Sequence, residues 1–178
     1  NRIGGIMITI DGGTGTILHN GTNYKSGSII QVVESGDFSS QVEVTNTTFT
    51  DTGVTATITP SAATSKVMVM VNGASFIRGT GYNVYGEIRL LRASTEIARV
   101  DHMYDSANSS FGARLGLSYA MSRLDTPSTT NATTYKVQIR LAGTNYSPKI
   151  RVPSLQGSTD NNDKKYLGNK IQLMEVAA

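Results

Sequence analysis

Residues 134–141 read Thr-Tyr-Lys-Val-Gln-Ile-Arg-Leu, and this stretch decides the fold class. Every second residue is apolar, and the residues between are polar or charged. Successive side chains of a β-strand point to opposite faces, so this alternation predicts a strand with one face in the core and the other in water. The apolar members of the alternation are Tyr135, Val137, Ile139 and Leu141.

The same period-two pattern recurs on both sides of this stretch, and no segment of a dozen residues has the spacing of an amphipathic helix. Clusters of Gly, Pro, Asn, Asp and Ser separate the apolar runs and predict turns. We therefore predict an all-β, antiparallel, jelly-roll-like β-sandwich of about ten strands. The further predicted strands are 28–34, 41–45, 53–59, 66–71, 87–94, 96–103, 113–121, 149–152 and 170–176.

Two of these strands carry more specific expectations. In 66–71, valines and methionines alternate, so both faces of the strand are apolar. We expect the valines in the core, and Met68 and Met70 at an interface with another copy of the chain. In the last strand, the residues expected inside the sandwich are Ile171, Leu173 and Val176.

Residues 1–27 differ from the rest of the chain, because short apolar alternations lie within a run rich in Gly, Thr and Asn. An isolated two-stranded ribbon is marginal in water, so Ile6, Ile8 and Ile10 need partners, either the edge of the sandwich or equivalent segments of other chains. We favour the second arrangement: a shaft or trimerisation segment over 1–27, followed by a sandwich knob domain over 28–178. The sequence also begins without Met, which suggests a fragment or a processed chain.

Composition excludes several classes of site and partner. The chain has no Cys, which excludes a disulfide framework, a thiolate zinc site and a Cys nucleophile. No apolar run approaches the roughly 18 residues of a membrane helix, so we expect no membrane insertion. The net charge is +3, but the 16 Lys and Arg residues are scattered along the chain, so we expect no nucleic-acid partner.

Few residues have the spacing of a catalytic or metal site. Residues 101–105 place His102 near two Asp residues, but neighbouring strand positions point to opposite faces. We expect a satisfied histidine at the surface or at a trimer interface. Residues 160–163 are rich in oxygen ligands but lack the spacing of a helix-loop-helix calcium loop, which indicates a solvated loop.

Catalytic carboxylates are not indicated either. Glycoside hydrolysis needs two carboxyl groups held close together, whereas the strand glutamates are expected to point outward into solvent. These glutamates are Glu34, Glu43, Glu87 and Glu96. No Gly-x-Ser-x-Gly elbow supports a serine nucleophile. We therefore predict a protein with no enzymatic activity, no metal and no cofactor.

Tyrosines, amides and carboxylates are concentrated in three predicted loops. Flat amphipathic rings together with amide and carboxylate groups bind sugars and protein epitopes. Loops carry recognition on β scaffolds because their backbone is free of strand pairing. The predicted receptor-binding residues are Tyr82, Asn83 and Tyr85, then Asn145 and Tyr146, then Asp160, Asn161, Asn162 and Tyr166.

From Gly27 to Ala178 the chain resembles the C-terminal globular domain of many tailed-phage fibre and virion structural proteins, especially those of marine and cyanobacterial phages. The segments that carry the resemblance are GSIIQVVE (27–34), FTDTGVTATITPSAATSKVMVMVNG (49–73), SYAMSRLDTPSTTNATTYKVQIRLAG (118–143) and KIQLMEVAA (170–178). The resemblance implies a trimeric, β-rich knob at the end of a fibre. The chain departs from the family pattern at 159–169, so no receptor preference is carried over.

The predicted function is that of a non-enzymatic tail-fibre tip, located in the virion with other virion proteins and binding a host surface polysaccharide or protein as a homotrimer. Two alternatives within viruses stay open: a capsid-attached head fibre or decoration protein, and a tailspike that degrades glycan. A third class is a secreted adhesion or cytokine-like sandwich, because Asn-x-Ser/Thr sequons recur along the chain.

Overall fold

The computed structural model describes residues 8–11, 16–19, 27–35, 40–80, 83–105, 113–143, 148–153 and 169–178. Within these ranges every regular element is a strand, and there is no helix that could cross a membrane. The strands are β1 (Ile8–Asp11), β2 (Thr16–His19), β3 (Ile29–Glu34), β4 (Val42–Val44), β5 (Thr50–Ile58), β6 (Lys66–Gly79), β7 (Asn83–Arg92), β8 (Thr95–Asp105), β9 (Ala113–Asp125), β10 (Thr133–Leu141), β11 (Lys149–Val152) and β12 (Lys170–Val176).

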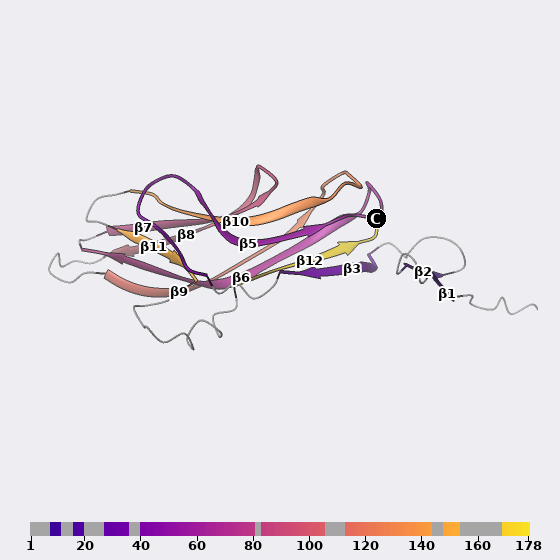
Figure 1. Ribbon diagram of the computed structural model, residues 1–178, viewed down its shortest axis with the longest axis horizontal. Helices are drawn as coiled ribbons and strands as arrows, with labels where there is room; N and C mark the ends of the chain where they lie inside the picture. Colours follow the sequence, from indigo (N-terminus) through magenta and orange to yellow (C-terminus); the bar gives the residue numbers. More distant parts are fainter. Residues whose placement is uncertain are drawn as a thin grey trace, which may run out of the picture.

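Two antiparallel sheets pack face to face and enclose the core (Figure 1). One sheet has the order β5-β10-β7-β8. In the other, β6 is the central strand: β9 pairs along one side of it, and β12 and β11 share the opposite side. β3 then pairs with β12, and β4 pairs with β11. The prediction of an all-β antiparallel sandwich is confirmed.

The strand order identifies a jelly roll. Apart from the short β4 and β11, the sandwich contains eight strands, arranged as β3-β12-β6-β9 and β5-β10-β7-β8. Among these eight, only the connection from β7 to β8 stays within one sheet, and every other connection crosses between the sheets. This double Greek-key order is that of the eight-stranded jelly roll.

In β10, buried and half-buried side chains alternate as the sequence predicts. Its four apolar side chains are buried, and the polar residues between them are half-buried on the outer face. In β12, Ile171 and Leu173 are buried as predicted, but the third inward position belongs to Glu175 and not to Val176. The strand keeps its period of two, so the residue two positions after Leu173 faces inward whatever its polarity.

Near the middle of β6, none of the described strands pairs on the side that β12 and β11 share. The pairing of β6 with β12 extends to Asn72 of β6, and the pairing of β6 with β11 begins at Phe76 of β6. The side chain of Asn169 fills this gap: its Oδ1 accepts hydrogen bonds from the Ala74 N–H at 3.2 Å and from the Tyr119 hydroxyl at 2.8 Å. Asn169 therefore takes the place of a missing strand residue.

The strands β1 and β2 pair with each other in a separate antiparallel hairpin. Among the described residues they do not add an edge to either sandwich sheet. The alternative in which this segment extends the edge of the sandwich is therefore not the arrangement found. Ile8 and Ile10 lie in β1, whereas Ile6 lies outside the described residues. Association of the hairpin with other chains stays a prediction.

Candidate functional site

The two ends of the sandwich carry different parts of the chain (Figure 1). At the end that we call proximal, the Gly27 N–H donates to the Ala177 carbonyl at 2.8 Å, and the Ala177 N–H donates to the Ser28 carbonyl at 2.9 Å. The chain therefore enters and leaves the sandwich at the same end. At the opposite, distal end, β6, β8 and β10 finish and β7, β9 and β11 begin.

The structure separates the three predicted binding loops. Two of them connect strands at the distal end: one between β6 and β7, the other between β10 and β11. The third runs from Pro153 to Asn169, and both of these residues lie beside the middle of β6, on the flank of the sandwich. The predicted binding residues that lie outside the described ranges are Tyr82, Asn145, Tyr146, Asp160, Asn161, Asn162 and Tyr166.

Asn83 and Tyr85 belong to β7, which corrects the prediction that both lie in a loop. Because Val84 is buried, Tyr85 points to the outer face of the sheet, where it is 39% exposed. Met103 of β8 lies directly opposite Tyr85 in the register and is 62% exposed. An exposed aromatic–thioether pair therefore stands near the distal end of this face.

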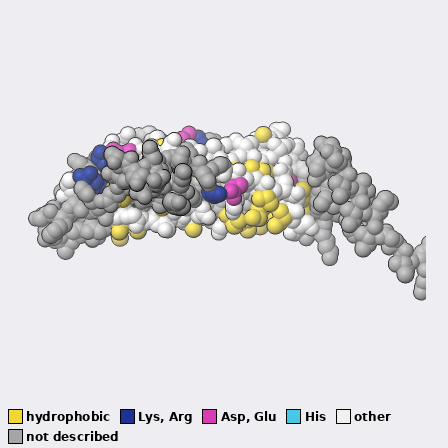
Figure 2. All heavy atoms as spheres, turned by 60° about the horizontal axis from the view of Figure 1, so that its bottom comes forward, with side chains coloured by type: hydrophobic (Ala, Val, Ile, Leu, Met, Phe, Trp, Pro, Cys, Tyr) yellow, Lys and Arg dark blue, Asp and Glu magenta, His cyan; other side chains and the backbone are white. Residues whose placement is uncertain are grey.

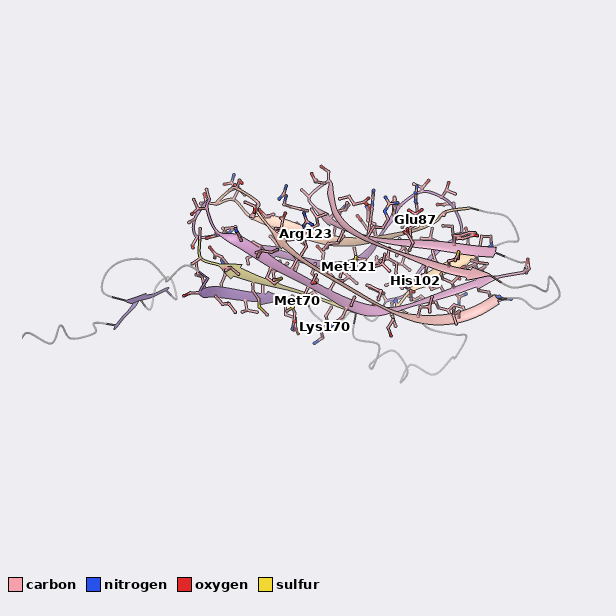
Figure 3. All side chains as sticks on the ribbon, turned by 180° about the vertical axis from the view of Figure 1, so that it is seen from behind. Met70, Glu87, His102, Met121, Arg123 and Lys170 are labelled. Atoms are coloured by element: carbon pink, nitrogen blue, oxygen red, sulfur yellow. The ribbon has the colours of Figure 1, made fainter. Side chains whose placement is uncertain are left out.

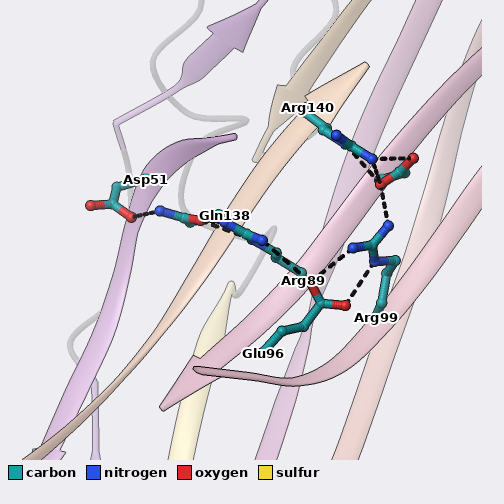
Figure 4. Close-up of polar contacts among 7 residues, drawn as sticks. Asp51, Arg89, Glu96, Arg99, Gln138 and Arg140 are labelled. Atoms are coloured by element: carbon teal, nitrogen blue, oxygen red, sulfur yellow. Dashed lines mark hydrogen bonds and ion pairs between the residues drawn. The ribbon is translucent and has the colours of Figure 1, made fainter. Parts of the chain in front are cut away.

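Next to this pair, Glu87 accepts hydrogen bonds from two arginines on neighbouring strands (Figure 4). Arg99 of β8 approaches it at 2.6 Å and Arg140 of β10 at 2.8 Å. Glu87 is only 9% exposed, so the prediction of a solvated outward carboxylate is wrong at this position. The long arginine side chains on both sides cover it, although it points outward from the sheet.

The polar contacts continue from these arginines across the same face. Arg89 donates to Gln138 at 2.6 and 2.9 Å and to Glu96 at 3.3 Å, while Arg99 donates to Glu96 at 2.8 and 2.9 Å. At the far side, Gln138 donates to Asp51 of β5 at 2.7 Å. We call these residues the arginine network, and they come from all four strands of the sheet. Its members are Asp51, Glu87, Arg89, Glu96, Arg99, Gln138 and Arg140.

The ring of Phe49 covers three of the guanidinium groups. Its centroid lies 3.6 Å from Cζ of Arg89, 4.4 Å from that of Arg140 and 5.4 Å from that of Arg99. Such contacts stabilise each cation over the ring face and restrict the arginine rotamers. Sequence reasoning missed Phe49 because it precedes β5 and belongs to no alternating pattern; a lone aromatic before a strand was the available signal.

Glu96 and Asp51 of the network are held in the charged form. Hydrogen bonds from Arg99 lower the pKa of Glu96, and the same contact raises the pKa of Arg99. Burial opposes ionisation of Asp51, but the hydrogen bonds from Gln138 and Lys136 outweigh it and lower the pKa of that carboxyl. The network therefore presents fixed guanidinium, amide and aromatic groups beside Tyr85 and Met103.

His102 lies inside the sandwich, which corrects the prediction of a surface or interface histidine. As expected for neighbouring strand positions, Asp101 is exposed on the opposite face. The Nδ1 atom of His102 is 2.8 Å from Oγ of Ser75 in β6, so this hydrogen bond joins the two sheets, and burial lowers the pKa of His102. Ser75 is fully buried, so a substrate cannot reach it.

No group of three or more His, Asp or Glu side chains suited to holding a metal ion occurs among the described residues. Residues 160–163, predicted to form a solvated loop, lie outside them.

The methionines of β6 lie on the outer face of the other sheet. Val67, Val69 and Val71 are buried in the core, and Met68 and Met70 are half-buried on the opposite side of the strand. Figure 3 shows Met70 and Glu87 on opposite sides of the sandwich, with Met121 and His102 between them. Coverage of the two methionines by another chain stays a prediction.

No protein-family model matches the chain, and no curated protein matches it. Among solved structures, dimeric latent PorU from Porphyromonas gingivalis is similar over 88% of this chain and 14% of its own, with 10% identity and a TM-score of 0.34. The Gt strain of infectious bursal disease virus is similar over 99% of this chain and 43% of its own, with 11% identity and a TM-score of 0.30. The Gx strain of the same virus is similar over 97% of this chain and 41% of its own, with 14% identity and a TM-score of 0.30. The chain thus spans less than half of each matched chain, and at TM-scores this low nothing about function follows.

Proposed function

We propose that the chain is a non-enzymatic structural protein of a phage virion, the knob at the tip of a tail fibre, and that its distal end contacts the receptor on the host cell. The observation that carries this proposal is that the chain enters and leaves the sandwich at the same end. Residues 27–28 and Ala177 are hydrogen-bonded to one another at the proximal end. A shaft that precedes residue 27 would therefore present the distal loops away from the rest of the fibre.

The residues near the distal end support binding without catalysis. The strands that border the loops holding Tyr82 and Asn145 end there, and Tyr85 and Met103 are exposed on the adjoining outer face. An exposed aromatic ring beside fixed guanidinium and amide groups suits the hydroxyl and carboxylate groups of a surface polysaccharide. Several such knobs on one virion would multiply a modest single-site affinity, by ~10² or more, where the receptor is repetitive.

The test compares two identical substitutions at opposite ends of the sandwich. Asn145→Ala changes a distal loop, and Asn131→Ala changes an exposed residue before β10 at the proximal end. We expect Asn145→Ala, Tyr82→Ala and Tyr85→Ala each to reduce adsorption of the purified protein to host cells, with melting temperatures close to that of the wild type. Asn131→Ala should adsorb as the wild type does. Equal adsorption by all four variants would contradict a distal receptor site.

A second measurement separates the tail-fibre tip from the other virion roles. A gold-labelled antibody against the chain should mark the tail fibres of intact virions. Labelling of the capsid would replace the tip by a capsid-attached fibre or decoration protein. Release of oligosaccharides from host polysaccharide by the purified protein would replace it by a glycan-degrading tailspike.

A further inference from the structure

An apolar row crosses the outer face of the sheet that contains β6. The register places Met174 of β12 between Val32 of β3 and Met68 of β6, and places Leu124 of β9 on the other side of Met68. We call these four residues the apolar row. Val32 is 57% exposed and Leu124 is 45% exposed, and the two methionines between them are half-buried. Figure 2 shows hydrophobic side chains gathered on this side of the molecule.

The adjoining row of the same face adds Met70 and brings no uncompensated charge. Met70 lies between Gln172 and Ser122 in the register, and Glu34 follows Gln172 at the sheet edge. Glu34 is the one charged residue in these two rows, and it is bonded to Lys170 at 2.9 Å and to Gln172. Hydrogen bonds from Lys170 and Gln172 lower the pKa of Glu34.

The outer faces of the two sheets therefore differ in chemistry. The face of β5-β10-β7-β8 carries the arginine network, in which the charged side chains contact one another and Phe49. The face of β3-β12-β6-β9 carries exposed and half-buried Val, Met and Leu side chains in register. Contiguous exposed apolar surface of this kind marks a contact site in a soluble protein.

The area of this face suits contact between protein chains. Four strands about 4.8 Å apart and about 24 Å long, as seven residues of β12 require, cover roughly 450 Å² in projection. The accessible area of protruding side chains is larger than that projection. A stable interface covers about 800 Å² on each partner, so this face supplies the greater part of one such surface.

The position of the row points to the occupant. Met68 is two residues from Lys66, the first residue of β6, so the apolar row lies about 7 Å from the proximal end. Gly27, the last residue of the segment 1–27, lies at that end and precedes β3, which contributes Val32 to the row. A symmetric assembly held by the segment 1–27 brings the same face of each copy close to the symmetry axis.

We propose that the apolar row is the self-association surface of the knob, covered by the same face of other copies of this chain in a homotrimer. This inference rests on the proposed function, because a shaft-borne knob supplies the symmetry axis. Methionine suits the role, since its flexible, polarisable side chain adapts to a partner surface without a fixed shape.

The experiment measures the mass of the full chain by light scattering at micromolar concentration. The wild type should have the mass of three chains. Met68→Glu, and Val32→Glu at the sheet edge, should each have the mass of one chain and still melt cooperatively. Met103→Glu is the matched control, an exposed methionine on the opposite sheet, and its mass should stay that of three chains. A monomeric wild type, or variants of the apolar row that remain trimeric, would overturn the proposal.

A cross-linking test does not depend on a charge substitution that could disturb folding. The chain has no Cys, so Met68→Cys supplies a single thiol on the face and Met103→Cys a single thiol on the other sheet. Under mild oxidation, Met68→Cys should form disulfide-linked chains while Met103→Cys stays a single chain; equal cross-linking of both would contradict the assignment. If Met68→Glu dissociates the trimer but the antibody labels a part of the virion other than the fibre, the interface is retained and the proposed function is rejected. If the antibody labels the fibre but Met68→Glu stays trimeric, the proposed function is retained and the interface is rejected.

Discussion

At the scale of single residues, the sandwich depends on polar side chains placed where the strand pattern is interrupted. Asn169 meets Tyr119 of β9 beside β6, at the point where neither β12 nor β11 pairs with β6, and Gly73 leaves room for both side chains. Glu175 is fully buried in β12 and accepts hydrogen bonds from Gln31 at 2.6 Å and from the Ser61 N–H and hydroxyl, each at 2.7 Å. These contacts fix the β5–β6 loop against the end of the sheet.

The substitution Gly73→Ala should strongly destabilise the fold. A Cβ at this position would lie 1.9 Å from Oδ1 of Asn169 and 2.7 Å from the ring of Tyr119, so both side chains would have to move and their hydrogen bond would be lost. Overpacking together with a lost buried hydrogen bond costs about 3 kcal/mol or more. Urea denaturation measures this loss. The control is Gly143→Ala, where nothing lies within 4 Å of the added Cβ and we expect a change within about 0.5 kcal/mol.

Glu175 should make stability fall in acid. Burial opposes ionisation of its carboxyl, but hydrogen bonds from Gln31, Ser61 and Ser65 outweigh it, so its folded-state pKa is lower than its unfolded value. The unfolded chain therefore binds the proton more tightly. Stability from this group is fully present above the unfolded pKa and is lost as pH falls through the folded pKa.

Glu175→Gln should cost about 1–3 kcal/mol near pH 7 and should lose less stability than the wild type between about pH 5 and pH 3. Denaturation curves at several pH values test this, with Asp101→Asn as an exposed control. An unchanged acid dependence in Glu175→Gln would show that other carboxylates govern it.

At the scale of elements, β12 joins β3 to the rest of its sheet. It lies between β3 and β6, so β3 has no other strand partner among the described residues. Its inward side chains Ile171 and Leu173 are fully buried. Removing β12 therefore opens the core and also releases β3.

Truncation after Gly168 should abolish cooperative folding. Burial of Ile171 and Leu173 stabilises the fold by about 1.5–3 kcal/mol each, and loss of the β3 and β6 pairings adds to this in a domain whose total stability is of the order of 5–15 kcal/mol. Solubility and a calorimetric melt test the prediction. Removal of the exposed Ala178 alone is the control and should have little effect. A truncated protein with a sharp melting transition would show that β12 is dispensable.

The elements also show where sequence reasoning succeeds. The strands β5, β10 and β12 were predicted because each has a core face, and a period of two records that face directly in the sequence. Glu175 was missed because the donors that stabilise it come from Ser61 and Gln31, which are far away in sequence. Glu87 was missed for the same reason, since Arg99 and Arg140 reach it from neighbouring strands.

The candidate site was predicted less well than the fold. Asn83 and Tyr85 were assigned to a loop because Gly79 and Gly81 closely precede them, whereas pairing with β8 extends the strand to Asn83. The arginine network and Phe49 cannot be derived from one strand at a time, because their contacts join four strands. The period-two pattern of a strand identifies which of its residues face outward, but not which side chains of the neighbouring strands cover them.

At the scale of the whole molecule, the hairpin and the sandwich are separate in their strand pairing. β1 and β2 pair with each other, whereas the sandwich closes on itself through the contacts between Gly27, Ser28 and Ala177. The two sheets are further joined by the hydrogen bond between Ser75 and His102. Stability of the sandwich and association of the chains should therefore respond to different changes.

Deletion of residues 1–26 should weaken the proposed trimer and leave the sandwich folded. Gly27 is kept so that its hydrogen bond to Ala177 remains. Light scattering over a dilution series should show dissociation at a higher protein concentration than for the full chain, with little change in the melting of the dissociated knob. A shortened chain that cannot fold would show that the segment belongs to the core of the sandwich.

The position of β12 has a consequence for how the protein is made. β3 is the first strand of the sandwich to be synthesised, but its partner among the described strands is β12, which is the last. The apolar row contains Met174 of β12, between Val32 and Met68, so the row does not exist on a chain that lacks β12. Chains whose synthesis stops before β12 therefore lack the surface that we propose for self-association, and under that proposal only chains that contain β12 would assemble.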